Sequence, residues 1–186
     1  MKETKLLGTY LTDDLKWNKN TCEIVKKAYK RMQLLNRVAG FTSNKQDLKK
    51  IYLTFIRSIL DQSAVVWHSS LTAKNRRDLE RVQKAAVRVI LGKNYMNYKD
   101  GLQKLQLENL NNRRKAICLK FAKNCLINEK VSSMFPKYLS KHKMKKIKIQ
   151  KFNVNLAKTK RYKKSSIPYM VQLLNQDNKN RKAVMK

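Results

Sequence analysis

Glycine and proline are unusually scarce: the 186 residues include four glycines and two prolines. An all-β sandwich or barrel needs many tight turns, which these two residues supply, whereas helices need few of them. Because 42% of the residues are hydrophobic, the chain has enough apolar surface to form a core. We therefore expect a mainly α protein: a small bundle of about five helices, preceded by a short strand and followed by a basic, partly extended C-terminal segment that ends in a short helix.

The spacing of apolar residues and the turn chemistry place these elements along the chain. Residues 5–11 alternate as in a short strand, and the polar residues 12–14 that follow are typical of a turn. The expected helices run from Asn20, with Glu23 completing a capping box, to Gly40; from Ser43, with Gln46, to Val66; from Thr72 to Gly92; from Asn97 to Leu105; and from Leu110 to Asn128.

The last third of the chain differs from the rest in charge density. Residues 131–186 carry a net charge of +15 and residues 1–130 a net charge of +17. The shorter segment therefore carries far more positive charge per residue. Apolar residues at 147–156 alternate as in an extended or bulged strand, and Pro168 opens a short amphipathic helix. We predict three segments: a strand and turn at 1–17, a helical bundle at 18–128 and a basic extension at 129–186.

The formal net charge of +32 predicts a polyanionic partner, because such a charge repels itself in a compact monomer. Nucleic acid and an anionic membrane surface both satisfy this requirement. A membrane-binding segment needs an apolar face opposite its lysines or a lipidation site, and the tail offers only residues 167–174 for this. We expect RNA, DNA or an RNA–DNA hybrid as the partner, rather than a membrane or a small molecule.

Two of the predicted helices carry rows of cations opposite their apolar faces. The row on the first helix is Lys19, Lys26, Lys30 and Arg37, and the row on the third is Lys74, Arg77, Arg81, Lys84 and Arg88. Asp78 and Glu80 fall outside the second row on a helical wheel. A solvated helix face also carries charge, but it usually mixes the two signs. We favour contacts from both rows to nucleic-acid phosphates.

Further cations fall outside these rows. We predict nucleic-acid contact by Arg113 and a structural ion pair for Arg114, with Asp100 or Glu108 as its partner. Basic runs in the tail supply further candidate contacts, Lys145, Lys146, Lys163 and Lys164, with aromatic residues between them that can stack on bases. Such runs are also typical of a flexible arm or a nuclear-import signal.

The sequence gives little support for catalysis or for a metal site. Asp13 and Asp14 are adjacent, but no second carboxylate cluster accompanies them, so a turn is the preferred interpretation over a two-metal site. Cys22, Cys118 and Cys125 include no CxxC pair, and an odd count argues against a disulfide framework. No secretory signal or membrane-spanning run is visible. We expect an intracellular, nuclear protein without catalytic or metal-binding residues or a cofactor.

Several short motifs, in this order, resemble the reverse transcriptases of jockey-like (LINE-type, non-LTR) retrotransposons. The segment Leu7-Gly8-x-x-Leu11-x-x-x-Leu15-x-Trp17 is similar to the end of their palm. The motifs that resemble the thumb and the region after the polymerase are Ile51-Tyr52, Val66-Trp67, 79–92, Arg113-Arg114, Met134-Phe135-Pro136 and 165–175. The resemblance covers nearly the whole chain.

The resemblance implies part of an RNA-directed DNA polymerase that holds template and primer. The family's catalytic Tyr-x-Asp-Asp hairpin and early palm aspartate precede the matched region, so we expect no polymerase activity from this chain alone. The Mg²⁺ that the whole polymerase uses would accordingly not be held here. Two alternatives stay open: the chain is a piece of an intact reverse transcriptase whose palm lies outside it, or it is a decayed fragment without activity.

Overall fold

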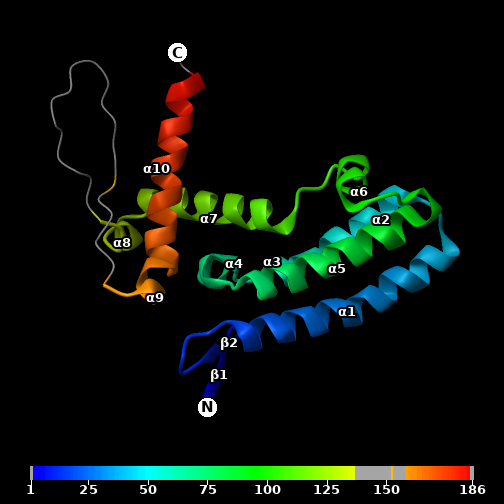
Figure 1. Ribbon diagram of the computed structural model, residues 1–186, viewed down its shortest axis with the longest axis horizontal. Helices are drawn as coiled ribbons and strands as arrows, with labels where there is room; N and C mark the ends of the chain where they lie inside the picture. Colours follow the sequence, from blue (N-terminus) through cyan, green and yellow to red (C-terminus); the bar gives the residue numbers. More distant parts are fainter. Residues whose placement is uncertain (1, 137–151, 153–157, 185–186) are drawn as a thin grey trace. The chain divides into compact units, whose positions relative to one another are not determined.

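A computed structural model of the chain describes residues 2–136, 152 and 158–184, the last six of them by their backbone alone. The protein is mainly helical, as predicted (Figure 1). Its contacts separate two compact units. Unit 1 contains residues up to Ala64 together with Leu71–Arg114, and unit 2 contains Val65–Ser70 together with the residues from Lys115 onward.

Unit 1 begins with a hairpin, β1 (Glu3–Leu6) and β2 (Thr9–Thr12), where the sequence predicted one strand over 5–11. Leu7 and Gly8 form the two-residue turn with φ values of 47° and 82°. Two successive left-handed residues match the twist of antiparallel strands, and glycine adopts this conformation without a steric penalty. The Gln62 side chain donates to the Leu7 carbonyl at 3.3 Å, which holds the turn against the helices.

The body of unit 1 consists of helices that follow one another along the chain. These are α1 (Asn18–Phe41), α2 (Lys45–Ile51), the π-helical segment η1 (Tyr52–Arg57), α3 (Ser58–Asp61), α5 (Ala73–Leu91), the 3₁₀ turn η3 (Gly92–Asn94) and α6 (Tyr98–Lys104). Their apolar faces form a core that includes Ala28, Leu35, Ile56, Leu60 and Leu79, all fully buried. On α1 and α5 the buried faces are those predicted from helical spacing.

On the predicted helix 43–66 the expected face was wrong after Tyr52. Phe55 and Val66, expected inside, are 44% and 45% exposed, and Ile56 and Leu60 are buried instead. The π-helical segment η1 adds a residue to the turn and so shifts the buried face, and a turn at residues 62–63 interrupts the helix.

Side-chain caps explain where α2, α5 and α6 begin, and a glycine explains where α5 ends. The Thr72 side chain accepts a hydrogen bond from the Asn75 backbone, and Gly92 ends α5 with a positive φ of 51°, as predicted. Asn97 caps α6 in the predicted way. The second predicted cap was wrong by one residue, because Asn44 rather than Ser43 accepts from Gln46.

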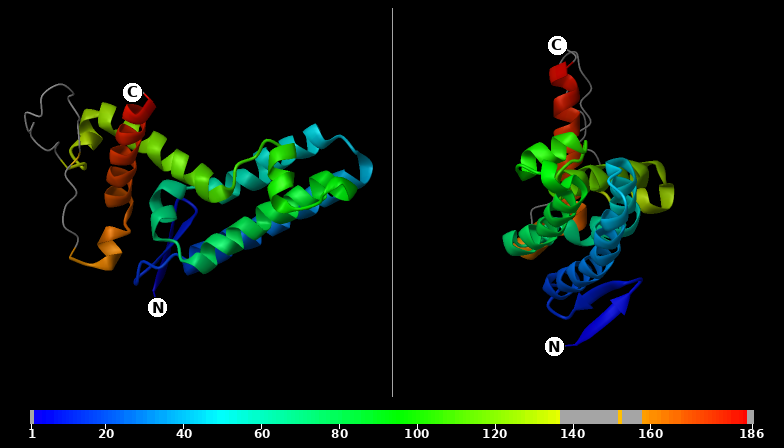
Figure 2. Two further views of the ribbon diagram at one scale, coloured as in Figure 1. Left: turned by 45° about the horizontal axis from the view of Figure 1, so that its top comes forward. Right: turned by 90° about the vertical axis from the view of Figure 1, so that its right-hand side faces the viewer.

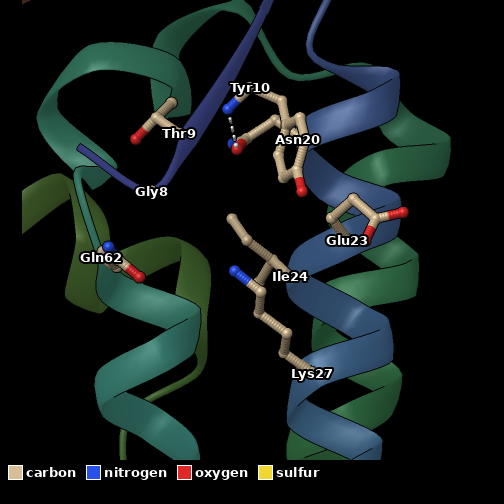
Figure 3. Close-up of a pocket in the computed structure, with 8 residues that line it drawn as sticks. All are labelled: Gly8, Thr9, Tyr10, Asn20, Glu23, Ile24, Lys27 and Gln62. Carbon is tan, nitrogen blue, oxygen red and sulfur yellow. Dashed lines mark hydrogen bonds between the residues drawn. The ribbon is translucent and has the colours of Figure 1, made fainter. Parts of the chain in front are cut away.

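The predicted capping box at Asn20 and Glu23 was also wrong, for a tertiary reason. Asn20 lies inside α1, is 1% exposed, and accepts a hydrogen bond from the Tyr10 backbone at 3.1 Å (Figure 3). The small cavity beside this contact has a volume of about 10 Å³, space for roughly one water molecule. Asn20 therefore joins the hairpin to α1 instead of capping the helix.

A buried polar network connects α5 to the rest of unit 1. The Gln83 amide accepts from the Tyr52 hydroxyl at 2.5 Å and donates to the Tyr98 hydroxyl and the Glu108 carbonyl, both at 2.9 Å. Tyr98 also donates to Glu80, whose carboxylate accepts from the Leu110 backbone at 3.1 Å. Burial raises the pKa of both tyrosines, so they remain neutral donors.

Unit 2 contains the 3₁₀ turn η2 (His68–Ser70), α8 (Glu129–Ser132), α9 (Lys160–Lys163) and α10 (Ser166–Val184). It also contains α4 (Ala64–Trp67) except for its first residue, and the part of α7 (Leu110–Ile127) that begins at Lys115. Its core joins Ala122 and Cys125 of α7 to Phe135, Phe152 and residues of α10. The Ser166 hydroxyl donates to the Val66 carbonyl at 2.8 Å, and Ser70 donates to the Lys164 carbonyl at 2.7 Å. Contacts between distant segments therefore assemble this unit.

The contacts group the chain differently from the predicted segments 1–17, 18–128 and 129–186. The hairpin belongs to unit 1, and the division falls after Arg114 rather than near residue 128. The prediction followed charge density, whereas α7 shares its apolar residues with α10. The predicted helix at Pro168 is present but longer, and the predicted extended residues 147, 149, 154 and 156 lie outside the described part of the chain. No described helix is long and apolar enough to cross a bilayer.

Candidate nucleic-acid interface

Helices α1 and α5 lie side by side and run in the same direction within unit 1 (Figures 1 and 2). At their N-terminal ends the Asn75 amide donates to the Asn18 side chain at 2.9 Å. Ile24, Ala28 and Leu35 of α1 face the core together with Leu79 and Val82 of α5. The cationic rows predicted on these two helices are thereby carried on neighbouring elements.

A groove separates the exposed sides of the two helices. It has a volume of about 440 Å³, and its lining residues are Asn18, Thr21, Cys22, Val25, Lys26 and Tyr29 of α1 and Lys74, Asn75, Asp78 and Arg81 of α5. Lys26 comes from one predicted row, and Lys74 and Arg81 come from the other. The two rows therefore border the same groove from opposite sides.

Helical spacing extends both rims beyond the groove itself. Lys30 lies one turn after Lys26, and Arg37 follows two turns later on the same face. On α5, cations recur at intervals of three or four residues from Lys74 to Arg88. We call the α1 row (Lys19, Lys26, Lys30, Arg37) rim 1 and the α5 row (Lys74, Arg77, Arg81, Lys84, Arg88) rim 2; all nine side chains are exposed.

Some rim cations have acidic neighbours, so the rims are less uniform in sign than the sequence indicated. Lys26 pairs with Glu23 at 3.1 Å, Arg81 with Asp78 at 3.2 Å, and Lys19 with Glu3 at 3.5 Å. The hydrogen bond from Lys26 lowers the pKa of Glu23 and raises the pKa of Lys26 itself. The ion pair with Arg81 places the carboxylate of Asp78 beside rim 2, and Asp78 also lines the groove.

The other rim cations are available to a ligand. Among the described residues, no ion pair involves Lys30, Arg37, Lys74, Arg77 or Lys84. Arg88 lies over the Tyr95 ring at 5.3 Å, a contact that leaves the edge of its guanidinium group open to an anion. Exposed ion pairs are weak, so the paired cations also exchange partners at little cost.

Arg113 and Arg114 lie at the start of α7, where the sequence predicted a nucleic-acid contact for the first and a structural ion pair for the second. Arg113 donates to Asp61 at 2.6 Å, so the close ion pair that the sequence assigned to Arg114 is made by its neighbour. Arg114 is fully buried, as expected for a structural role, and donates to the Leu60 carbonyl at 3.5 Å. Burial lowers its pKa, while Asp61 and Glu80 act in the opposite direction. The predicted partners, Asp100 and Glu108, are not the ones that the structure places here.

The contacts predicted in the tail belong to unit 2 or lie outside the described residues. Lys163 and Lys164 are exposed and belong to unit 2. Lys145 and Lys146 lie outside the described residues. Within unit 1, the structure thus brings together the cations of α1 and α5.

Asp13 and Asp14 have the local contacts of a turn. The Asp14 carboxylate accepts from the Thr12 hydroxyl at 2.7 Å and from the Lys16 backbone at 3.0 Å, and these bonds lower its pKa. Asp13 accepts from the Asp14 backbone at 2.9 Å. The described residues contain no group of three potential metal ligands.

Sequence reasoning missed three residues of this region. Tyr29 and Cys22 line the groove, but on a helical wheel they fall between the charged row and the apolar face. Positions 18, 22, 25 and 29 lie on one side of the helix and form a stripe of mixed polarity. This stripe is the sequence signal from which the groove residues of α1 could have been predicted. Asp61 had no local signal, because its partner Arg113 lies 52 residues away.

Comparison with known proteins returned no match among protein-family models, curated proteins or solved structures.

Proposed function

We propose that this chain binds RNA, DNA or an RNA–DNA hybrid through its phosphates and holds it without carrying out a reaction on it. The observation that supports the proposal is the pair of cationic rims that border one groove. Together with the motif resemblance, this suggests a module like the thumb of a jockey-like reverse transcriptase, placed in the nucleus with its nucleic-acid partner. Mg²⁺ and catalytic residues have no part in this function.

The physical basis of the proposal is neutralisation of phosphates by exposed cations. Each phosphate neutralised by lysine or arginine releases condensed counterions, which makes binding favourable and strongly dependent on salt. Phosphate contacts carry no sequence information, so we expect little sequence preference. Rim cations that make no ion pair among the described residues, such as Lys30 and Lys84, contribute most because they lose no such pair on binding.

Salt dependence is the first test. If about six phosphates are neutralised, the logarithm of the association constant falls with the logarithm of salt concentration with a slope near −5. Fluorescence anisotropy with labelled duplex, hybrid and single-stranded oligonucleotides measures this slope. A flat response to salt would reject the proposal.

Charge reversal with a matched control locates the contacts. The rim variant is Lys30→Glu with Lys84→Glu, and the control is Arg31→Glu with Arg76→Glu, two exposed cations on the same helices outside the rims. Both variants change the net charge equally. We expect the rim variant to weaken binding to every oligonucleotide and to reduce the salt slope by about 2, one for each phosphate contact. Equal losses in the two variants would show attraction by net charge alone, without a defined surface.

A further inference from the structure

The groove between the rims has features that phosphate contacts alone do not require. The Tyr29 side chain lines it and is 43% exposed, although it is a large aromatic residue. Val25, half-buried, adds apolar surface to the same wall. The volume of about 440 Å³ falls within the range of about 300–1,000 Å³ typical of small-molecule sites. The groove thus offers an aromatic face between two rows of cations.

Polar atoms in the groove have unused hydrogen-bonding capacity. Thr21 lines the groove, but its hydroxyl is buried, so this capacity comes from the side chains of two asparagines. The bond between Asn75 and Asn18 uses one N–H of the first amide and the oxygen of the second. The Asn75 oxygen and the Asn18 N–H groups therefore stay available as an acceptor and a donor.

From these observations we infer that the groove takes one unpaired nucleotide of a single-stranded RNA or DNA segment. The base stacks on Tyr29, its polar edge bonds to the amides of Asn18 and Asn75, and its flanking phosphates lie on the cations of the two rims that line the groove. This inference rests on the proposed function and specifies the form of nucleic acid that enters the groove. Aromatic side chains bind unpaired bases in this way in single-strand-binding proteins, with little dependence on base identity.

A duplex cannot occupy the groove in the same manner. Each base in a duplex has its two faces covered by its neighbours, so Tyr29 meets a base face only where pairing is absent. The rims do not require unpaired bases, so they bind the phosphates of single strands and of duplexes alike. Single strands, and duplexes with an unpaired end, therefore make a contact that a blunt duplex does not make.

The first experiment compares variants of Tyr29 on single-stranded and blunt duplex oligonucleotides at one salt concentration. Tyr29→Ala should weaken binding of the single strand about tenfold and leave duplex binding unchanged. Tyr29→Phe keeps the ring and should bind both forms normally. Phe55→Ala is the matched control, since Phe55 is 44% exposed, belongs to the same unit and is not among the residues of the groove. Equal effects of Tyr29→Ala on both forms, or no effect on either, would overturn the inference.

The second experiment uses Cys22 as a built-in reporter in the unmodified protein. Cys22 lines the groove and is exposed, whereas Cys118 and Cys125, the other two cysteines, are buried. An uncharged thiol reagent should therefore modify Cys22 first. We expect a saturating single strand to slow this modification at least about tenfold and a blunt duplex to slow it less. Protection by polyglutamate but not by the single strand would assign the groove to an acidic peptide and overturn the inference.

The outcomes separate this inference from the proposed function. If charge reversal on the rims abolishes binding while Tyr29→Ala and the reactivity of Cys22 show no difference between strand forms, the phosphate surface stands and the groove is not a base site. If the protein binds no oligonucleotide at low salt, both proposals fail together.

Discussion

The two units reach a stable core by different routes. In unit 1, α1 packs against α3 and α5 through apolar residues at helical spacing, and a buried network around Gln83 connects α5 to other segments of the unit. In unit 2, the core depends on segments far apart in the sequence: the bond between Ser166 and Val66 spans 100 residues. Local patterns therefore specify the individual helices of unit 1, whereas the core of unit 2 depends on a few long-range anchors.

The largest expected effect is the loss of an anchor in unit 2. Phe152 is 3% exposed, and its backbone pairs with the Asn175 side chain at 2.9 and 3.1 Å. Phe152→Ala should lower the free energy of unfolding of unit 2 by about 3–5 kcal/mol. Hydrogen exchange should show faster exchange in α10 and unchanged exchange in α5. Met134→Ala, at a residue that is 59% exposed, is the control and should change stability by less than about 0.5 kcal/mol.

A smaller effect is expected when the network of unit 1 is broken. Gln83→Leu keeps the side chain's approximate size but leaves Tyr52, Tyr98 and the Glu108 carbonyl without their shared partner. The cost should be about 1–3 kcal/mol, measured by denaturant unfolding. Gln33→Leu, an exposed glutamine on α1, is the control. If both variants lose the same free energy of unfolding, the buried network does not contribute to the stability of unit 1.

Removing one helix cap in unit 1 should cost less again. Thr72→Ala deletes the acceptor for the Asn75 backbone N–H and should lower stability by about 1 kcal/mol. Thr72→Ser retains the hydroxyl and should restore most of the loss. Thermal unfolding followed by circular dichroism provides the measurement, and equal losses in both variants would assign the effect to the lost methyl group.

The smallest predicted effect is a change in alkaline stability. Burial and the bond to Glu80 raise the pKa of Tyr98 above its ordinary value of 10.0, so the folded state holds this proton more tightly than the unfolded state. Its contribution is complete below pH 10 and is lost as the pH rises above that value. Tyr98→Phe should have a lower melting temperature than the native protein near pH 8. Between pH 10 and 11, the melting temperature of the variant should fall less steeply than that of the native protein. Identical slopes would contradict this assignment.

Much of the fold was predictable because its signals are local. Thr72 and Gly92 delimit α5, and Asn97 begins α6, through contacts within a few residues. The hairpin turn at Leu7-Gly8 was missed, because Leu-Gly is not a strong turn signal and Leu7 adopts a positive φ. The capping box at Asn20 failed because the asparagine bonds to a strand ten residues earlier.

The sequence alone specified which segments are helical, the apolar faces of α1 and α5, and the cationic rows opposite them, since these follow from spacing over three or four residues. It misplaced the apolar face of the helix predicted at 43–66, because the π-helical segment η1 shifts that face by one residue. Three features follow from tertiary contacts alone: rims 1 and 2 border one groove, Tyr29 lines that groove, and Asp61 pairs with Arg113 rather than with Arg114. These arrangements depend on helices that are about 50 residues apart in the sequence, and no local pattern specifies how two such helices are placed against each other.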